Sequence, residues 1–249
     1  MIIADLQIHS RYARACSTQI NIENLEKWAR IKGIDLLGCA DFQHPLWNKE
    51  IKEKLTEDEN GILWTKTKFP FIWQTEISLM YSQGGKGRRI HFLIYSPNKE
   101  VSDQIIEALG KKGRLDYDGR PIFGFSAIEL VDIMNKISKD IEIIPAHCLT
   151  PWFGLFGSKS GFDSLKEAFK EQVDKIYAIE TGMSSDPEMN WHISELNNKA
   201  IVSFSDSHSF WPWRLGREAT IFSKISGYKD IIKQIRENTI LGTIETSPL

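Results

Sequence analysis

The sequence contains few cysteines and no pair of them at the spacing of a zinc-binding motif. Its three cysteines, Cys16, Cys39 and Cys148, are widely separated, and no Cys-x-x-Cys occurs among the 249 residues. An odd number of dispersed cysteines argues against a disulfide framework and against a zinc ribbon. We therefore expect the protein to work in a reducing, cytoplasmic environment.

The sequence also lacks long apolar runs, a signal peptide and a large net charge. No apolar run approaches the roughly 20 residues needed to cross a bilayer, and the start, Met-Ile-Ile-Ala-Asp, has neither a basic region nor a cleavage site. The formal net charge is −2, so a nucleic-acid partner would need a local basic patch. These features predict no membrane partner and leave the oligomeric state open.

The remaining composition is that of one large globular domain. Hydrophobic residues make up 41% and charged residues 26% of the chain, which is ordinary. Helical and short apolar segments alternate about seven times, which is typical of a parallel α/β fold with right-handed crossovers. Strands are expected at 2–8, 34–40, 69–79, 90–95, 141–146, 176–179, 201–204, 219–223 and 240–245, and helices at 22–32, 46–58, 127–138, 163–173 and 228–237.

Potential metal ligands recur where these strands end. The apolar segment at 201–204 leads into Asp206 and His208, and residues two apart in extended backbone point to the same face. In parallel α/β barrels the active site collects at the carboxyl ends of the strands. His91 is the exception, because it lies at the start of its expected strand. The other ligand types at or near strand ends are His9, Asp41, Glu76, His147 and Glu180.

The first strand admits two interpretations. Asp5, Gln7 and His9 alternate with Leu6 and Ile8, so the three polar groups share one face. They would either face solvent from an edge strand or contribute to a buried site.

Imidazole and carboxylate groups together favour Zn, Mn or Fe over Ca or Mg. We expect two or three such ions, with Glu76 as the bridging carboxylate. A cluster of this kind lowers the pKa of a bound water and stabilises an in-line phosphoryl displacement. His44 is a further possible ligand, whereas His192 is expected at the surface. The sequence has no Gly-x-Ser-x-Gly elbow to compete for the nucleophile role.

These motifs together resemble the PHP (polymerase and histidinol phosphatase) superfamily. The residues concerned are Asp5-x-Gln-x-His9-Ser10, Ala40-Asp41, Thr75-Glu76, Pro145-Ala146-His147 and Ser205-Asp206-Ser207-His208. Their surroundings resemble the endonuclease Q group of DNA-repair nucleases, through His9-Ser-Arg-Tyr12, residues 24–33, Thr150-Pro-Trp152, residues 161–165 and Arg214-Leu-Gly-Arg-Glu218. The resemblance implies a distorted (β/α)7 TIM-like barrel, here a single domain over 1–249. It also implies metal-dependent cleavage of DNA on the 5′ side of deaminated bases.

The resemblance assigns roles to individual residues. The expected metal ligands are Gln7, His9, Asp41, Glu76, His91, His147, Asp206 and His208, of which Asp41, Asp206 and His208 are also expected to be catalytic. The expected substrate-binding residues are Arg11, Lys86, Arg88, Arg89, Trp152, Glu180 and Arg214. This chain departs from the family pattern at two positions. Gln7 stands where a histidine is usual, and Phe42 follows Asp41 where the second motif of the family usually ends in Asp-His.

Two other functions remain open at this stage. A phosphomonoesterase of the histidinol-phosphatase type would have a closed, narrow pocket without a basic groove. A catalytically silent binding module would bind no metal, and Gln7 and Phe42 favour that alternative. Exposed tryptophans near the barrel mouth, Trp152, Trp211 and Trp213, would either stack on a base or pack as lids.

Overall fold

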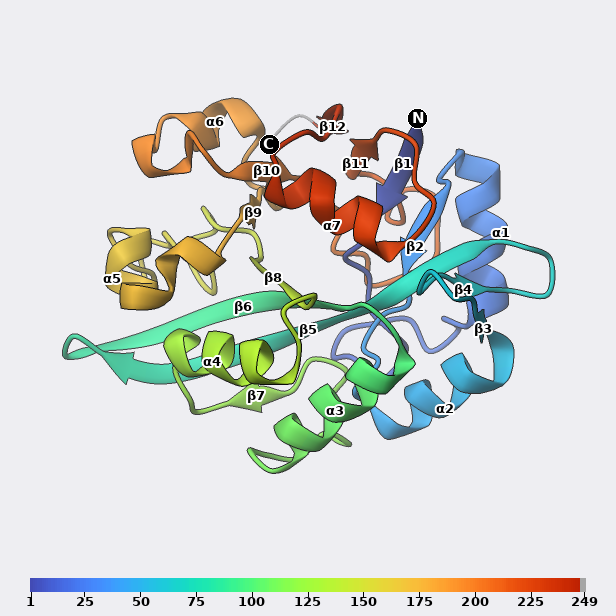
Figure 1. Cartoon of the computed structure of the whole chain (residues 1–249), viewed down its shortest axis with the longest axis horizontal. Helices are drawn as coiled ribbons and strands as arrows, with labels where there is room; N and C mark the ends of the chain where they lie inside the picture. Colours follow the sequence, from blue (N-terminus) through green and yellow to red (C-terminus); the bar gives the residue numbers. More distant parts are fainter. Residues whose placement is uncertain (247–249) are drawn as a thin grey trace.

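The computed structural model describes residues 1–246, so the last three residues of the expected 1–249 domain lie outside it. It has an α/β fold in which helices surround a central mixed sheet (Figure 1). The strands of the main sheet are, in order, β12 (Gly242–Ile244), β11 (Ala219–Phe222), β1 (Ile2–Asp5), β2 (Leu36–Gly38), β5 (Pro70–Gln83), β4 (Leu63–Trp64) and β3 (Thr56–Glu57). β5 also pairs with β7 (Ile122–Phe123) and with β6 (Lys86–Ser96), and β6 in turn pairs with β8 (Glu142–Pro145). A separate pair is formed by β9 (Ala178–Glu180) and β10 (Ala200–Val202).

The expectation of an all-parallel sheet is wrong. β1, β2 and β5 are parallel to one another, but β6 is antiparallel to both β5 and β8, and β11 is antiparallel to β1. The cause lies in the turn between β5 and β6, where Gly84 and Gly85 have φ angles of 63° and 72°. Two successive residues with positive φ form a tight hairpin turn, which requires antiparallel strands. Among the described residues, strand pairing does not close the sheet into a complete barrel.

The reversed direction of β6 explains the position of His91. Because the two strands run in opposite directions, the first half of β6 lies beside the second half of β5, and His91 is opposite Ser78. Glu76 lies two residues before Ser78 and on the same face, so Glu76 and His91 are diagonal neighbours. Glu76 is therefore in the middle of a long strand and not at its end.

Several helices begin and end where the sequence predicts. α1 (Ile22–Lys32) is capped by Asn21, whose side chain accepts a hydrogen bond from the Asn24 amide, and it ends at Gly33 with φ of 81°. The Ser126 side chain likewise caps α4 (Ala127–Ile137). The last helix, α7 (Tyr228–Arg236), also lies within its expected range.

Other helices differ from expectation. α2 (Pro45–Lys54) is shorter than expected and buries Trp47 and Ile51. The 163–173 segment divides into α5 (Leu165–Phe169) and a 3₁₀ helix over Lys170–Lys175. α3 (Lys99–Gly110) was not expected. The short α6 (Pro187–Trp191) begins where Asp186-Pro187 marks a helix start, and the 3₁₀ helix Ser194–Leu196 follows it.

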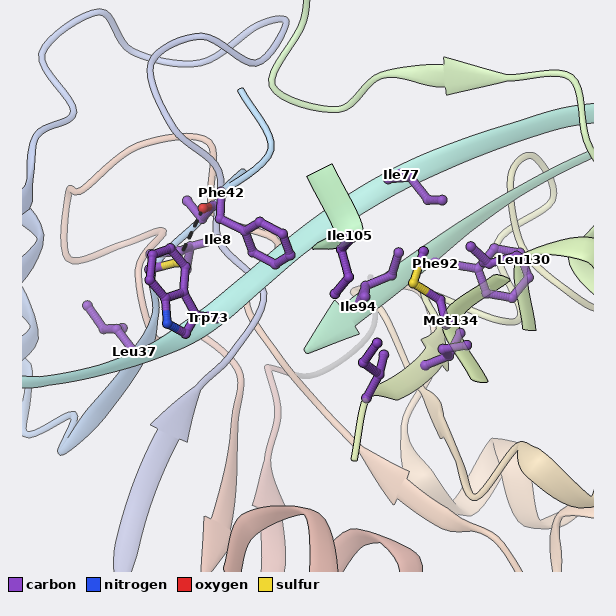
Figure 2. Close-up of a cluster of buried hydrophobic side chains, with 14 of the residues drawn as sticks. Ile8, Leu37, Phe42, Trp73, Ile77, Phe92, Ile94, Ile105, Leu130 and Met134 are labelled. Atoms are coloured by element: carbon purple, nitrogen blue, oxygen red, sulfur yellow. Dashed lines mark hydrogen bonds between the residues drawn. The ribbon is translucent and has the colours of Figure 1, made fainter. Parts of the chain in front are cut away.

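The core fixes the sheet against the helices. In Figure 2, Phe92 and Ile94 of β6 lie near Ile105 of α3 and Leu130 and Met134 of α4, all within one buried cluster. Burying each such side chain contributes about 1.5–3 kcal/mol. Phe42 belongs to the same cluster and packs edge-to-face with Trp73, with 5.9 Å between the ring centroids. Position 42 therefore supplies packing in this chain.

None of the helices in the described part of the chain has the length and apolar character required to span a bilayer.

Candidate metal centre

The structure brings six of the eight expected ligands together in two groups of three, and Gln7 and Asp41 belong to neither group. One group is Glu76, His91 and His147, and the other is His9, Asp206 and His208. Within each group the ligand atoms lie within 4.8 Å of one another. Residues from five separate parts of the chain therefore converge on one place, as expected for a metal site.

The carboxylate of Glu76 connects the two groups. Its Oε1 is 2.8 Å from His91 Nδ1 and 3.6 Å from His147 Nε2, whereas its Oε2 is 3.1 Å from His9 Nε2. Glu76 is completely buried. One oxygen therefore faces each group, which is the geometry of a bridging carboxylate.

Asp41 orients the His9 ring. Asp41 Oδ1 lies 3.0 Å from His9 Nδ1, and Oδ2 accepts a hydrogen bond from the Ser10 amide at 2.6 Å. Protonation of His9 at Nδ1 leaves the lone pair of Nε2 pointing toward Glu76 and Asp206. A carboxylate that holds the far nitrogen of a ligand histidine is the usual outer partner in metal sites. Asp41 thus binds the outer nitrogen of a ligand histidine and is itself a member of neither ligand group.

The far nitrogens of two other histidines also have oxygen partners. His147 Nδ1 is 3.2 Å from the Thr150 hydroxyl, and His208 Nδ1 is 2.8 Å from the Asp206 carbonyl. Because a carbonyl only accepts, His208 carries its proton on Nδ1. His147 and Asp206 both have positive φ, at 36° and 46°. Such strained backbone is typical of functional sites.

Two buried carboxylates hold the loops that carry these ligands. Glu180 accepts hydrogen bonds from the amides of His147 (2.5 Å) and Gly182 (2.8 Å). Asp5 accepts from the amides of Ser205 (3.0 Å) and Gly216 (2.8 Å). Burial raises the pKa of Glu180 to about 7 and that of Asp5 to about 6. Glu180 and Asp5 thus fix the backbone at His147 and next to Asp206.

Gln7 provides a test of whether the residues suit a metal. Asp5, Gln7 and His9 are all completely buried, so the alternative of a solvated strand face is wrong. Gln7 Nε2 donates to Glu76 Oε2 at 3.0 Å, but Gln7 Oε1 is buried without a hydrogen-bond partner. An unpaired buried oxygen is costly, and a cation beside Glu76 would satisfy it. The donor set therefore fits a divalent metal.

The surrounding charges set the protonation of the histidines. Burial lowers the pKa of His91 to about 4, against the opposing effect of Glu76, so its ring is neutral at pH 7 and can bind a cation. Burial also opposes protonation of His9, but Asp41, Asp206 and Glu76 raise its pKa well above the usual value. His9 is thus the ring on which the negative charge of the site acts most strongly.

Of the seven expected substrate-binding residues, Glu180 is completely buried and bound to backbone amides, and the other six fall into two classes. Arg11 is paired with Glu50, and Arg88 is buried and paired with Glu167 at 2.6 Å. These two side chains already have partners within the fold. In contrast, Trp152 and three cationic residues expose their side chains to solvent; the cationic residues are Lys86, Arg89 and Arg214.

One side of the centre is open. A cavity of about 360 Å³ is lined by Asp206, His208, Arg214 and Arg217, together with Ala15, Ser17 and Ser209. Among the ligands, the side chains of Asp206 and His208 are 25% and 30% exposed. Substrate can therefore approach from this side. His44 stacks on Tyr12 at 4.3 Å, away from both ligand groups, and His192 is exposed as expected.

Sequence analysis missed Arg120, which donates to Glu76 Oε1 at 3.2 Å. It lies between two ligands that are far apart in the sequence, and no family motif includes it. The turn-like run Asp118-Gly119-Arg120-Pro121 was the available signal.

Comparisons with known proteins identify sequence relatives of parts of the chain. No family model matches. The chain is 30% identical over 196 residues to the uncharacterized protein YqxK of Bacillus subtilis, which covers 75% of this chain and 47% of that protein. It is also 30% identical over 148 residues, 59% of its length, to an uncharacterized protein of Methanocaldococcus jannaschii, of which the match covers 16%. The chain thus spans less than half the length of either relative.

Several solved structures superpose on this chain. The lesion-specific endonuclease Q of Pyrococcus furiosus superposes over 99% of this chain and 59% of its own, with a TM-score of 0.87 and 28% identity. An endonuclease Q in complex with a 27-mer duplex carrying an abasic lesion matches 94% of this chain and 56% of its own, with a TM-score of 0.84 and 30% identity. A putative metal-dependent phosphoesterase of Bifidobacterium adolescentis shares the fold at a TM-score of 0.52 and 12% identity. In sequence and in fold, this chain is therefore endonuclease Q-like over nearly its whole length.

Proposed function

We propose that this chain is a metal-dependent phosphodiesterase that cleaves DNA at damaged bases. The observation that carries the proposal is the pair of ligand groups joined by the two oxygens of Glu76. Two cations held in this way act on the attacking and leaving oxygens of one phosphate. The likeness to endonuclease Q, one of whose structures contains a lesion-bearing duplex, supports DNA as the substrate.

The residues of each group define two metal positions. One position would use His91, His147 and Glu76, and the other would use His9, Asp206, His208, Glu76 and the amide oxygen of Gln7. Zn, Mn or Fe suits these donors. Ions bound there would supply an activated water and stabilise the charge of the displacement. Phe42 packs in the core and His44 stacks on Tyr12, so we propose two ions and not three.

The chain's own residues orient this chemistry. Asp41 fixes His9 in one tautomer, and Glu180 holds the backbone of His147. Asp206 and His208 border the open cavity, so an ion that they hold would face the reacting phosphate and could activate the attacking water.

Exposed cations around the opening would hold the flanking phosphates. Arg214 and Arg217 line the cavity next to Asp206. Lys86 and Arg89 extend from the β5–β6 hairpin, and the Arg89 guanidinium lies 5.6 Å from the Trp152 ring. An exposed indole beside a cation suits stacking on a base displaced from the duplex. We propose deaminated bases as the damage that is recognised.

We also propose that 1–249 forms a single, distorted barrel. The pairing β8–β6–β5–β2–β1 makes most of a ring, and the β9–β10 pair lies between β8 and β1. Cys148 N donates to Glu180 O at 2.9 Å on one side, and His9 N donates to Ser207 O at 3.0 Å on the other. These loop hydrogen bonds would complete the ring where strand pairing does not.

The test combines metal analysis with cleavage assays. Protein purified without chelators should contain two transition-metal equivalents. It should nick an oligonucleotide with one uracil or hypoxanthine on the 5′ side of that base, and leave an undamaged strand intact. Glu76→Gln should lose both metal and activity, whereas Glu107→Gln on the exposed face of α3 should lose neither. Absence of bound metal even after titration would indicate a silent binding module. Turnover of p-nitrophenyl phosphate without a damage-dependent nick would indicate a small-molecule phosphatase.

A further inference from the structure

Among the described residues, Arg120 is the only lysine or arginine that forms an ion pair with a carboxylate of the two ligand groups, and none of the motifs named above includes it. Its Nη1 lies 3.2 Å from Glu76 Oε1, and the side chain is only 23% exposed. Glu76 Oε1 also lies 2.8 Å from His91 Nδ1. We propose that Arg120 binds the phosphoryl group of the substrate, an inference that rests on the proposed phosphodiesterase function.

The loop that carries Arg120 is fixed at several points. The Arg120 amide donates to Asp118 Oδ1 at 3.0 Å, and the Gly119 amide donates to the Tyr12 carbonyl at 3.0 Å. The Gly119 carbonyl accepts from Gln43 Nε2 at 2.5 Å. A Cβ atom at Gly119 would collide with Asp41 Oδ2 and Ala13. The loop thus packs closely against Asp41. Its hydrogen bonds fix the backbone of Arg120 and so restrict the positions that the guanidinium can reach.

Ions bound at the centre would change the negative charge that is available to balance Arg120. Glu76 is the only carboxylate within 4 Å of Arg120 among the described residues. When both oxygens of Glu76 bind cations, Arg120 loses much of that partner's charge and lies beside two divalent ions. The combined positive charge then exceeds that of the three carboxylates Asp41, Glu76 and Asp206. A guanidinium that is largely shielded from water and has lost its counter-charge is unfavourable, which favours the entry of an anion together with the ions.

A phosphodiester has the charge and shape that this position needs. A guanidinium donates two parallel hydrogen bonds to the oxygens of one phosphate, in a geometry that lysine cannot reproduce. Arg120 would therefore bind the non-bridging oxygens of the phosphate, and ions held by the two ligand groups would stabilise the charge of the displacement. Such a donor stabilises the negative charge that grows in the transition state.

The experiment compares Arg120→Gln and Arg120→Lys with the wild type, each loaded with metal. Arg114→Gln is the matched control, because Arg114 is in the same loop but 74% exposed and paired with Asp116. Metal content is measured by elemental analysis, inorganic phosphate binding by calorimetry, and hydrolysis with bis(p-nitrophenyl) phosphate. We expect Arg120→Gln to keep its metal, bind phosphate at least tenfold more weakly and lose about 10²-fold in kcat/KM. Arg120→Lys should be intermediate, and Arg114→Gln should match the wild type.

Two results would overturn this role. If Arg120→Gln loses metal and excess metal restores its activity, Arg120 only compensates the carboxylates. If phosphate affinity and kcat/KM are both unchanged, Arg120 does not contact the anion. A wild-type protein that hydrolyses neither DNA nor the diester would refute the proposed function instead. The phosphate titration of wild type and Arg120→Gln would still decide the role of Arg120, since it requires no turnover.

Discussion

Asp41 belongs to neither ligand group but holds the outer nitrogen of His9, which is a member of one. Its two oxygens accept from His9 Nδ1 and from the Ser10 amide. In Asp41→Asn, one of these oxygens becomes an NH₂ group, so one donor is left without an acceptor. We expect metal affinity to fall about 10–100-fold, as for other outer partners of ligand histidines.

Competition with a chelator of known affinity measures this effect. Asp116→Asn is the control, because Asp116 is an exposed carboxylate paired with Arg114. Equal affinity in wild type and Asp41→Asn would show that the tautomer of His9 does not depend on Asp41.

Gln7 stands where the sequence pattern that this chain resembles usually has a histidine. Its buried, unpaired Oε1 would be a neutral and weak ligand. We expect Gln7→His to bind one of the two ions more tightly and Gln7→Leu to bind it more weakly, while the ion at His91 and His147 is unaffected. Titration calorimetry resolves the two sites. Identical affinities in all three proteins would mean that Gln7 only positions Glu76.

At the residue scale, the convergence of potential ligands could be anticipated where the residue ends or follows a strand. His147, Asp206 and His208 could be identified because an apolar run precedes each of them. Arg120 could not, since its contact with Glu76 spans 44 residues and depends on a loop with no regular periodicity. Arg11 and Arg88 were expected at the substrate, but the sequence does not reveal that Glu50 and Glu167 lie beside them.

At the scale of elements, helix ends were more predictable than strand directions. Local hydrogen bonds determine a helix end, as at Asn21 and Ser126. Strand direction depends on the connection, and a Gly-Gly turn was sufficient to reverse β6. That reversal places His91 next to Glu76, which the expected all-parallel sheet left unexplained.

The contact between β8 and α7 predicts a pH effect on stability. Burial raises the pKa of Glu142 from 4.5 to about 7, against the opposing effect of Arg236, whose Nε donates to it at 2.7 Å. Because the folded-state pKa is the higher one, the folded state binds the proton more tightly. This contribution to stability is present below about pH 4.5 and is lost as pH rises through 7.

Glu142→Gln removes that titration and keeps the side-chain shape. Between pH 5 and pH 8, the wild type should lose about 3 kcal/mol relative to Glu142→Gln. Urea unfolding at several pH values gives both curves, and their difference cancels the contribution of other groups. Parallel curves would show that Glu142 stays ionised in the folded protein.

At the scale of the whole molecule, charge and not shape should govern the binding of DNA. The formal net charge is −2, so attraction must come from the exposed cations near the opening. Each phosphate contact lowers log K by about 0.9 per tenfold increase in salt. We therefore expect nicking of uracil- or hypoxanthine-containing strands at low salt that declines steeply as ionic strength rises.

Single substitutions identify which cations contribute to this slope. Arg89 lies near the start of β6, beside Trp152, so Arg89→Gln should reduce the slope by about one unit and weaken binding to all sequences alike. Lys229 is exposed near Pro97, just past the other end of β6, so Lys229→Gln should leave the slope unchanged. The measurement is binding of a labelled oligonucleotide at four or more salt concentrations, with single-turnover cleavage followed at saturating protein. If Arg89 only positions DNA, its loss changes the affinity but not the cleavage rate of the bound strand. An equal loss of slope in both variants would mean that binding follows the overall charge of the protein and not the cations around its metal centre.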